Sequence, residues 1–170
     1  MADTPSTPPA AGPKIEKVKE VLLSAAVLAL DVTPDGKTAF AACQDGGVHS
    51  IDLAAGRAEL LGRHESYASG VALLPDGKTL VTSGYDGLLK WHRLAERKEL
   101  RSVKAHDFWS WDMDVSPDGR TVASATGRYE AGGYKYEPAP EREPSVKLFD
   151  AATGELLRAL EHVPPVQAVA

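Results

Sequence analysis

The chain has 170 residues, of which 43% are hydrophobic and 25% charged, a balance typical of a folded globular protein. The net charge is −5, and the lysines and arginines are scattered along the chain. A protein that binds phosphate backbones usually has a cluster of basic residues, so nucleic acid is not an expected partner. The longest apolar run, residues 21–30, is shorter than the roughly 20 residues of a membrane span. We therefore expect no membrane partner and a cytoplasmic location.

Cys43 is the only cysteine. The chain can form no internal disulfide, which is compatible with a reducing compartment. We expect Cys43 to be a small buried hydrophobic residue and not a reactive thiol.

The N-terminal region divides into two parts. Residues 1–13 contain four prolines and almost no bulky apolar side chain, so burial cannot offset the entropy of ordering them, and a disordered tail is predicted. In residues 14–26, Ile15, Val18 and Leu22 have helical spacing, whereas the position of the segment before the next strand fits an outer strand. We expect an outer strand or a short helix, and the repeat register described next favours the strand.

A unit of about 41 residues repeats along the rest of the chain. The Pro-Asp-Gly prolines Pro34, Pro75 and Pro117 are 41 and 42 residues apart, and His64 and His106 each stand 11 residues before the next one. A period of roughly 40 to 45 residues with four strands in each repeat indicates a β-propeller blade.

Each unit reads as four short strands in an all-β fold. The Pro-Asp-Gly turn closes the first hairpin, and Asp45-Gly46 and Asp86-Gly87 are typical of a second. We predict first strands at 27–32, 70–73 and 111–115, second strands at 38–42, 79–83 and 121–125, and third strands at 48–53, 88–94 and 146–150, each followed by a shorter fourth.

Residues 145–162, SVKLFDAATGELLRALEH, resemble the third and fourth strands of a WD40 repeat, with Phe149-Asp150 at the place of the Trp-Asp pair of that family. The first two repeats depart from the pattern, with Ile51-Asp52 and His92-Arg93 at this dipeptide. The resemblance covers residues 27–170. It implies a partial WD40 propeller with repeats at about 27–65, 66–107 and 108–162, and a fourth that begins at 163.

The chain stops inside the expected fourth repeat. His162 begins that repeat, and the 11-residue offset would place its proline at 173, past Ala170. About three blades and the first strand of a fourth cannot close a ring, because propellers typically have about 4 to 8 blades. We interpret the chain as truncated, since it stops within a strand; the alternative is a ring closed by several chains. An open ring is expected to self-associate through its unpaired edges.

The WD40 resemblance implies a buried hydrogen-bond chain of His64, Thr82 and Asp86, with His106 and Ser124 as its counterpart in the third repeat. These residue types resemble a catalytic triad, but a triad needs an exposed nucleophile and an oxyanion hole. We therefore expect a structural network and no catalytic residue.

No metal site and no cofactor are predicted. His49, His92 and His162 show no ligand spacing with a cysteine or an acid. Asp31 and Asp114 recur at one position of the innermost strand and are a weak cation-site signal, but Ala72 interrupts the pattern in the middle repeat.

Two aromatic segments are candidates for binding. Residues 128–144, RYEAGGYKYEPAPEREP, are inserted between the second and third strands of the third repeat and form either a tolerated surface insertion or a binding loop. In DFWSW, residues 107–111, we expect Trp109 to be exposed and Trp111 to be in the core, and Tyr67 has the place of Trp109 in the second repeat. The predicted partner-binding rim comprises Tyr67, Trp109, Tyr129, Tyr134 and Tyr136.

The leading functional hypothesis is a non-enzymatic scaffold that binds a protein or a peptide, an inference by analogy with the fold. One alternative is an enzyme or ligand-binding protein like the bacterial lactonase-type propellers, whose repeats residues 32–61 also resemble. The recurring histidines and Asp-Gly turns, and the lack of converging ionisable groups, argue against it. Another alternative is a propeller module of a larger multidomain protein.

Overall fold

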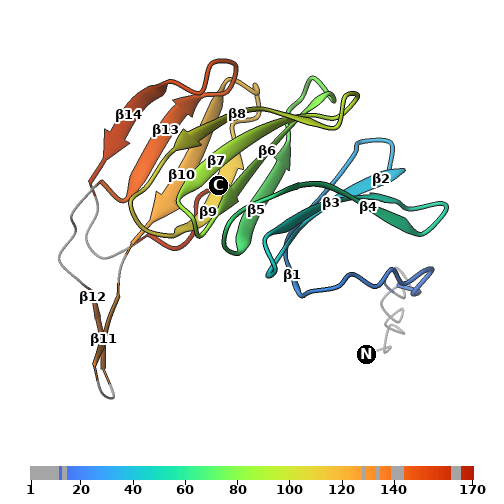
Figure 1. Cartoon of the computed structure of the whole chain (residues 1–170), viewed down its shortest axis with the longest axis horizontal. Coiled ribbons are helices and arrows are strands. Elements are labelled where there is room, and N and C mark those ends of the chain that lie inside the picture. The colour runs from blue at the N-terminus through green and yellow to red at the C-terminus, as the bar shows by residue number, and fades with distance from the viewer. Residues whose placement is uncertain (1–11, 13–14, 128, 133–134, 139–143, 162–165) are drawn as a thin grey trace, which may run out of the picture.

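A computed structural model gives the fold (Figure 1) and describes residues 12, 15–127, 129–132, 135–138, 144–161 and 166–170. All regular secondary structure in these ranges is β-strand. A helix able to cross a membrane is absent from this part of the chain. The strands are β1 (Val27–Val32), β2 (Thr38–Cys43), β3 (Gly47–Asp52), β4 (Arg57–Arg63), β5 (Ala68–Leu73), β6 (Thr79–Gly84), β7 (Leu88–Arg93), β8 (Lys98–Lys104), β9 (Ser110–Val115), β10 (Thr121–Thr126), β11 (Tyr129–Gly132), β12 (Lys135–Pro138), β13 (Val146–Asp150) and β14 (Leu156–Leu160).

The strands form three antiparallel four-stranded sheets in the orders β1-β2-β3-β4, β5-β6-β7-β8 and β9-β10-β13-β14. We call these sheets blades 1, 2 and 3. They lie side by side in an open arc (Figure 1), with β5 in contact with both β1 and β9, while β11 and β12 form a separate hairpin. The prediction of an all-β fold of four-stranded propeller blades in an open ring is confirmed.

The Pro-Asp-Gly turns explain why each blade begins as a tight hairpin. The glycine of each turn has a positive φ, a backbone conformation in which a Cβ is unfavourable. The aspartate carboxylate of each turn accepts the amide two residues later, at 3.1 Å from Lys37, 2.8 Å from Lys78 and 3.0 Å from Arg120. These bonds hold each turn through contacts within three residues.

Apolar side chains between the blades form the core. The neighbouring residues Leu80 and Val81 of β6 are both fully buried, and they belong to two different clusters because successive strand residues point to opposite faces. Leu80 packs with Phe40 and other residues of blade 1, and Val81 packs in a cluster that includes Phe149 of blade 3. Burying such a side chain stabilises the fold by about 1.5 to 3 kcal/mol.

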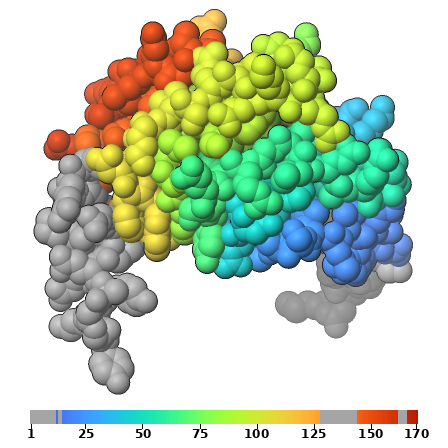
Figure 2. Space-filling view, viewed as in Figure 1, coloured from blue at the N-terminus to red at the C-terminus, as the bar shows by residue number. Residues whose placement is uncertain are grey.

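Residues 15–26 form neither the outer strand nor the helix expected for residues 14–26. An outer strand needs a third strand to pair with, and β3, β7 and β13 each already pair with their own fourth strand. The segment instead lies against blade 1 (Figure 2), where Val21, Leu23 and Ala25 pack on Ala41 and Cys43. The predicted tail, residues 1–13, lies outside the described residues except for Gly12.

The expected first strand of a fourth blade is not formed in the described residues 166–170. A strand requires a hydrogen-bonded partner strand, and residues 166–170 pair with none of the described strands. The segment still approaches the innermost strand of blade 3, because the Val169 amide donates to the Asp112 carboxylate at 3.0 Å.

We predict that the chain self-associates in solution. The face of blade 1 that points away from blade 2 exposes apolar side chains of β1 that a neighbouring blade would cover, with Leu30 58% exposed and Val32 40% exposed. Size-exclusion chromatography with light scattering should show a mass that rises with protein concentration. The double variant Leu30→Lys, Val32→Lys should shift the distribution to monomer.

A Leu100→Lys variant is the matched control, because Leu100 is also an exposed strand leucine, 40% exposed, but lies in the middle blade. It should associate as the parent does. A parent chain that stays monomeric across the micromolar range would contradict the prediction.

Candidate functional site

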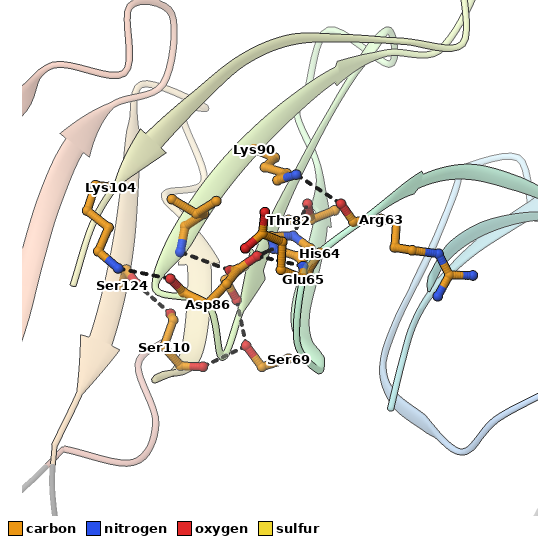
Figure 3. Close-up of polar contacts among 12 residues, drawn as sticks. Arg63, His64, Glu65, Ser69, Thr82, Asp86, Lys90, Lys104, Ser110 and Ser124 are labelled. Atoms are coloured by element: carbon orange, nitrogen blue, oxygen red, sulfur yellow. Dashed lines mark hydrogen bonds and ion pairs between the residues drawn. The ribbon is translucent and has the colours of Figure 1, made fainter. Parts of the chain in front are cut away.

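His64, Thr82 and Asp86 meet between blades 1 and 2 (Figure 3). The His64 Nδ1 atom lies 3.0 Å from both Asp86 carboxylate oxygens, and its Nε2 atom lies 2.9 Å from the Thr82 hydroxyl. His64 comes from the β4–β5 connection, Thr82 from β6 and Asp86 from the β6–β7 turn. The network therefore ties the loop that enters blade 2 to a strand and a turn inside that blade.

The Asp86 carboxylate also accepts the backbone amides of Glu65 at 3.0 Å and Leu88 at 3.1 Å. Burial alone would raise the pKa of Asp86, but the hydrogen bond and charge of His64 and these two amides together lower it below its usual value. Asp86 is therefore held as a carboxylate that organises the turn. The Lys104 ammonium group donates to the Asp86 carbonyl oxygen at 3.0 Å and fixes the turn from the other side.

His92 also belongs to the network, although the predicted network does not include it. Its Nε2 atom lies 3.1 Å from the Thr82 hydroxyl, and its ring fits against Gly62 of β4, where an added Cβ would lie 2.7 Å from the His92 Cε1 atom. Burial lowers the pKa of His92 to about 4, so the ring is neutral near pH 7. The available signal was strand periodicity, since His92 pairs with Leu80 and so shares a face with Thr82.

Blade 3 has a shorter version of the network. The His106 Nε2 atom lies 3.1 Å from the Ser124 hydroxyl, which lies 2.8 Å from the Ser110 hydroxyl. The Ser69 hydroxyl of β5 donates to the Ser110 carbonyl at 2.7 Å and so joins blades 2 and 3 (Figure 3). All four side chains are buried.

The burial of Thr82 excludes it as a catalytic nucleophile. Its hydroxyl belongs to a fully buried side chain that contacts two histidines, so no substrate carbonyl can reach it without opening the blade interface. The arrangement can satisfy buried polar groups and hold the loop, so a structural role remains our prediction for these residues.

Asp31 and Asp114, the weak cation-site signal, bind backbone amides. The two Asp31 oxygens accept the amides of Val32 and Leu73, each at 2.7 Å, so Asp31 links β1 to β5 of the next blade. The Asp114 carboxylate accepts the Val115 amide at 2.7 Å. These carboxylates therefore contribute to joining and shaping the innermost strands.

An aromatic cluster lies where β5 and β9 begin, and we define it as Tyr67, Tyr85, Phe108, Trp109 and Trp111. Tyr85 stacks on Trp109 with ring centroids 4.8 Å apart and lies 5.3 Å from Tyr67. Phe108 also stacks on Trp109, with ring centroids 4.7 Å apart. Rings from the strand ends and loops of blades 2 and 3 thus form one continuous group of aromatic contacts.

Two rings of the cluster are strongly exposed, Tyr67 at 41% and Trp109 at 40%. Trp111, which we expected in the core, is half-buried; it packs edge-on against Trp109 at 5.6 Å and donates its indole N–H to the Gly127 carbonyl at 2.7 Å. Trp111 packs on the exposed ring of Trp109 and belongs to none of the apolar clusters between blades, so its indole stays half-buried.

The insertion begins at the cluster. Gly127, the acceptor for Trp111, directly precedes the residues that lead into the β11–β12 hairpin, which projects from blade 3 (Figure 1). Tyr129 pairs through its backbone with Pro138, and Tyr136 with Ala131. Tyr134 of the predicted rim lies outside the described residues.

The sequence analysis did not include Tyr85 and Phe108 in the rim. A signal for Tyr85 was its place directly before the Asp86-Gly87 turn, since that turn meets the loop that carries Tyr67. The Tyr85 amide donates to the Tyr67 carbonyl at 2.8 Å.

Comparison with known proteins agrees with this architecture. The three sheets, their joining loops and the repeated histidine contacts define a chain of β-propeller blades. The family model described as "WD domain, G-beta repeat" matches residues 58–92 and 97–129. Residues 58–92 and 97–129 are therefore similar to WD40 repeats, and the chain has the fold of WD40 propeller blades.

A curated relative, Protein groucho of Drosophila melanogaster, is 36% identical over 115 residues, which is 63% of this chain and 15% of that protein. Among solved structures, the RRP9 WD40 repeats superpose with a TM-score of 0.69 at 19% identity over 86% of this chain and 42% of that one. A Kuenenia stuttgartiensis hydrazine synthase chain gives a TM-score of 0.69 at 18% identity over 91% and 42%. The chain thus spans well under half the length of these proteins, and the structural matches show the fold alone.

We predict that His64 and Asp86 stabilise the fold. Replacing either with Ala should lower the free energy of unfolding by about 1 to 3 kcal/mol, because a buried partner loses its hydrogen bond. The double variant should lose less than the sum of the single losses, because the two side chains contact each other. Chemical denaturation midpoints measure all three values, with Glu96→Ala at an exposed position between β7 and β8 as control.

Unchanged midpoints for both single variants would contradict this role. Additive losses would show that the His64–Asp86 contact contributes nothing of its own.

We also predict that His92 makes stability depend on pH between about 6.5 and 4. In this window the unfolded chain binds a proton at residue 92 that the folded chain does not, so the free energy of unfolding falls as the pH falls. The full effect is on the order of 3 kcal/mol. His92→Phe should remove this part of the slope, since Phe149 already occupies the equivalent position of blade 3.

Urea denaturation of the parent and of His92→Phe at several pH values from 7 to 4 checks the difference. Identical pH slopes in the two proteins would rule out the inferred neutral His92.

Proposed function

We propose that the chain is a non-catalytic scaffold that binds a protein or peptide partner through the aromatic cluster. The observation that carries the proposal is that Tyr67 and Trp109 expose about two fifths of their surface, at 41% and 40%, while their neighbours hold them in place. Tyr and Trp provide a large contact area with few rotatable bonds and a polar end, which suits them as interface anchors.

The cluster is rigid enough to act as a preformed surface. The Thr126 hydroxyl donates to the Trp109 carbonyl at 2.7 Å, and Tyr85 is sandwiched between Tyr67 and Trp109. A partner that docks on fixed rings loses less free energy to ordering than one that docks on mobile side chains.

The charges around the cluster favour a basic partner segment. Glu65 and Asp107, each two residues before a ring of the cluster, are exposed. Arginine and lysine also bind the faces of aromatic rings. We propose an extended Arg- or Lys-containing segment as the ligand, with the β11–β12 hairpin as an additional wall of the site.

The proposal is non-catalytic because the ionisable groups brought together in the described residues serve structural contacts. Thr82 is buried, and Asp31 and Asp114 bind backbone amides. None of these arrangements presents an accessible nucleophile beside a base.

Selection of a displayed random-peptide library on the chain tests this function. We expect bound peptides to be enriched in Arg and Lys. In fluorescence anisotropy, Trp109→Ala should weaken binding of a selected peptide by at least about tenfold, as for an interface hot spot. Deletion of residues 132–142 should also weaken it, with thermal stability close to that of the parent.

Leu100→Ala is the matched control, because Leu100 and Trp109 are both 40% exposed and Leu100 lies in β8, outside the cluster. It should leave peptide affinity unchanged. Equal affinities for Trp109→Ala, the deletion and the parent would show that the aromatic cluster is not the binding surface.

A further inference from the structure

Cys43, Asp45 and His49 come together at the edge of blade 1. Their potential ligand atoms, the Cys43 sulfur, an Asp45 carboxylate oxygen and a His49 ring nitrogen, all lie within 4.8 Å of one another. Spacing along the chain shows no ligand pattern at His49, because the three residues meet across two strands and the turn between them. Pairing of β2 with β3 sets His49 opposite Ala41, two residues from Cys43, so both side chains share a face.

The His49 ring is placed as a ligand would be. Its Nε2 atom is buried and has no hydrogen-bond partner in the described part of the chain. The ring lies over Gly47, where an added Cβ would be 2.7 Å from Nε2 and 3.0 Å from an Asp45 oxygen. The absence of a side chain at Gly47 therefore leaves the space that His49 and Asp45 share.

The other two groups complete a mixed donor set. Cys43 is fully buried, and Asp45 lies in the β2–β3 turn with its Oδ1 atom on the Gly47 amide at 3.0 Å and its Oδ2 atom 3.3 Å from the Ser24 hydroxyl. Residues 21–25, which pack on this face, thus close the site from the N-terminal side.

Thiolate, imidazole and carboxylate together match Zn²⁺, whereas Ca²⁺ and Mg²⁺ take oxygen ligands. Zinc–ligand bonds of about 2.0 to 2.3 Å in a tetrahedron separate neighbouring ligand atoms by about 3.5 Å. Side-chain rotation that brings the three groups roughly 1 Å closer would reach this geometry, and a water molecule would take the fourth position.

We propose that Cys43, Asp45 and His49 form a binding site for one zinc ion, which fastens the N-terminal segment and the β2–β3 turn onto blade 1. The site is separate from the aromatic cluster and does not depend on the proposed scaffold function.

Cobalt substitution tests the site, because Cys43 is the only cysteine and any thiolate-to-metal charge-transfer band reports on it alone. Metal-free protein titrated with Co²⁺ should develop this near-ultraviolet band and the visible bands of tetrahedral Co²⁺, saturating at one ion per chain. Excess Zn²⁺ should remove both. Zn²⁺ should also raise the Tm, since a ligand that binds the folded state stabilises it.

Three variants locate the ion. Cys43→Ala should abolish the charge-transfer band, and His49→Gln should weaken Co²⁺ binding by at least about tenfold. Gly47→Ala keeps every ligand but places a methyl group against the His49 ring, so it should weaken binding as well. Asp35→Asn, an exposed turn aspartate in the same blade, should bind as the parent does.

Folding of each variant is checked by circular dichroism. A folded parent that shows no charge-transfer band with Co²⁺ overturns the proposal. A band that persists unchanged in both His49→Gln and Gly47→Ala also overturns it, because the metal would then bind the cysteine without the rest of the site.

Discussion

A propeller blade has two faces, and the need to cover both governs this structure. Successive residues of β6 point in opposite directions, so Leu80 requires blade 1 and Val81 requires blade 3. A single four-stranded sheet cannot satisfy both faces, and each blade is stable only between neighbours. The same requirement explains why residues 21–25 pack on the otherwise open face of blade 1, and why Leu30 and Val32 of β1 remain exposed.

Because the blades pack tightly, each polar group buried between them destabilises the fold unless it has a hydrogen-bond partner. The contacts of His64 with Asp86 and Thr82, and of Ser69 with Ser110, meet this demand in two successive interfaces. Blade 1 meets it differently. At the places that correspond to His64 and Thr82 it has Leu23 and Ala41, which pack as apolar residues.

Much of the fold could be predicted because its signals are local. Pro-Asp-Gly and Asp-Gly turns punctuate strands whose predicted ends differ from the observed ones by at most two residues. Residues 15–26 could not be predicted in this way, because their register matches a fourth strand but strand formation depends on a partner elsewhere. The resemblance to WD40 repeats was enough to group His64, Thr82 and Asp86.

Contacts across strands were harder to foresee. His92 reaches Thr82 and His49 approaches Cys43 through the period of neighbouring strands, a relation that spacing along the chain does not display. Tyr85 joins Tyr67 and Trp109 because a turn of one blade meets two loops. Nothing in a single repeat marks such a meeting point, which forms only when adjacent blades assemble.

The close fit of His92 against Gly62 has a consequence for how such sequences diverge. The two residues belong to different blades, yet a single methyl group at position 62 would collide with the ring. Enlarging residue 62 is therefore tolerated only after residue 92 has become smaller, and a larger ring at 92 keeps 62 as glycine. Neighbouring repeats of this kind cannot be duplicated or exchanged as independent units, because the side chains of one repeat must fit the residues of the repeat beside it.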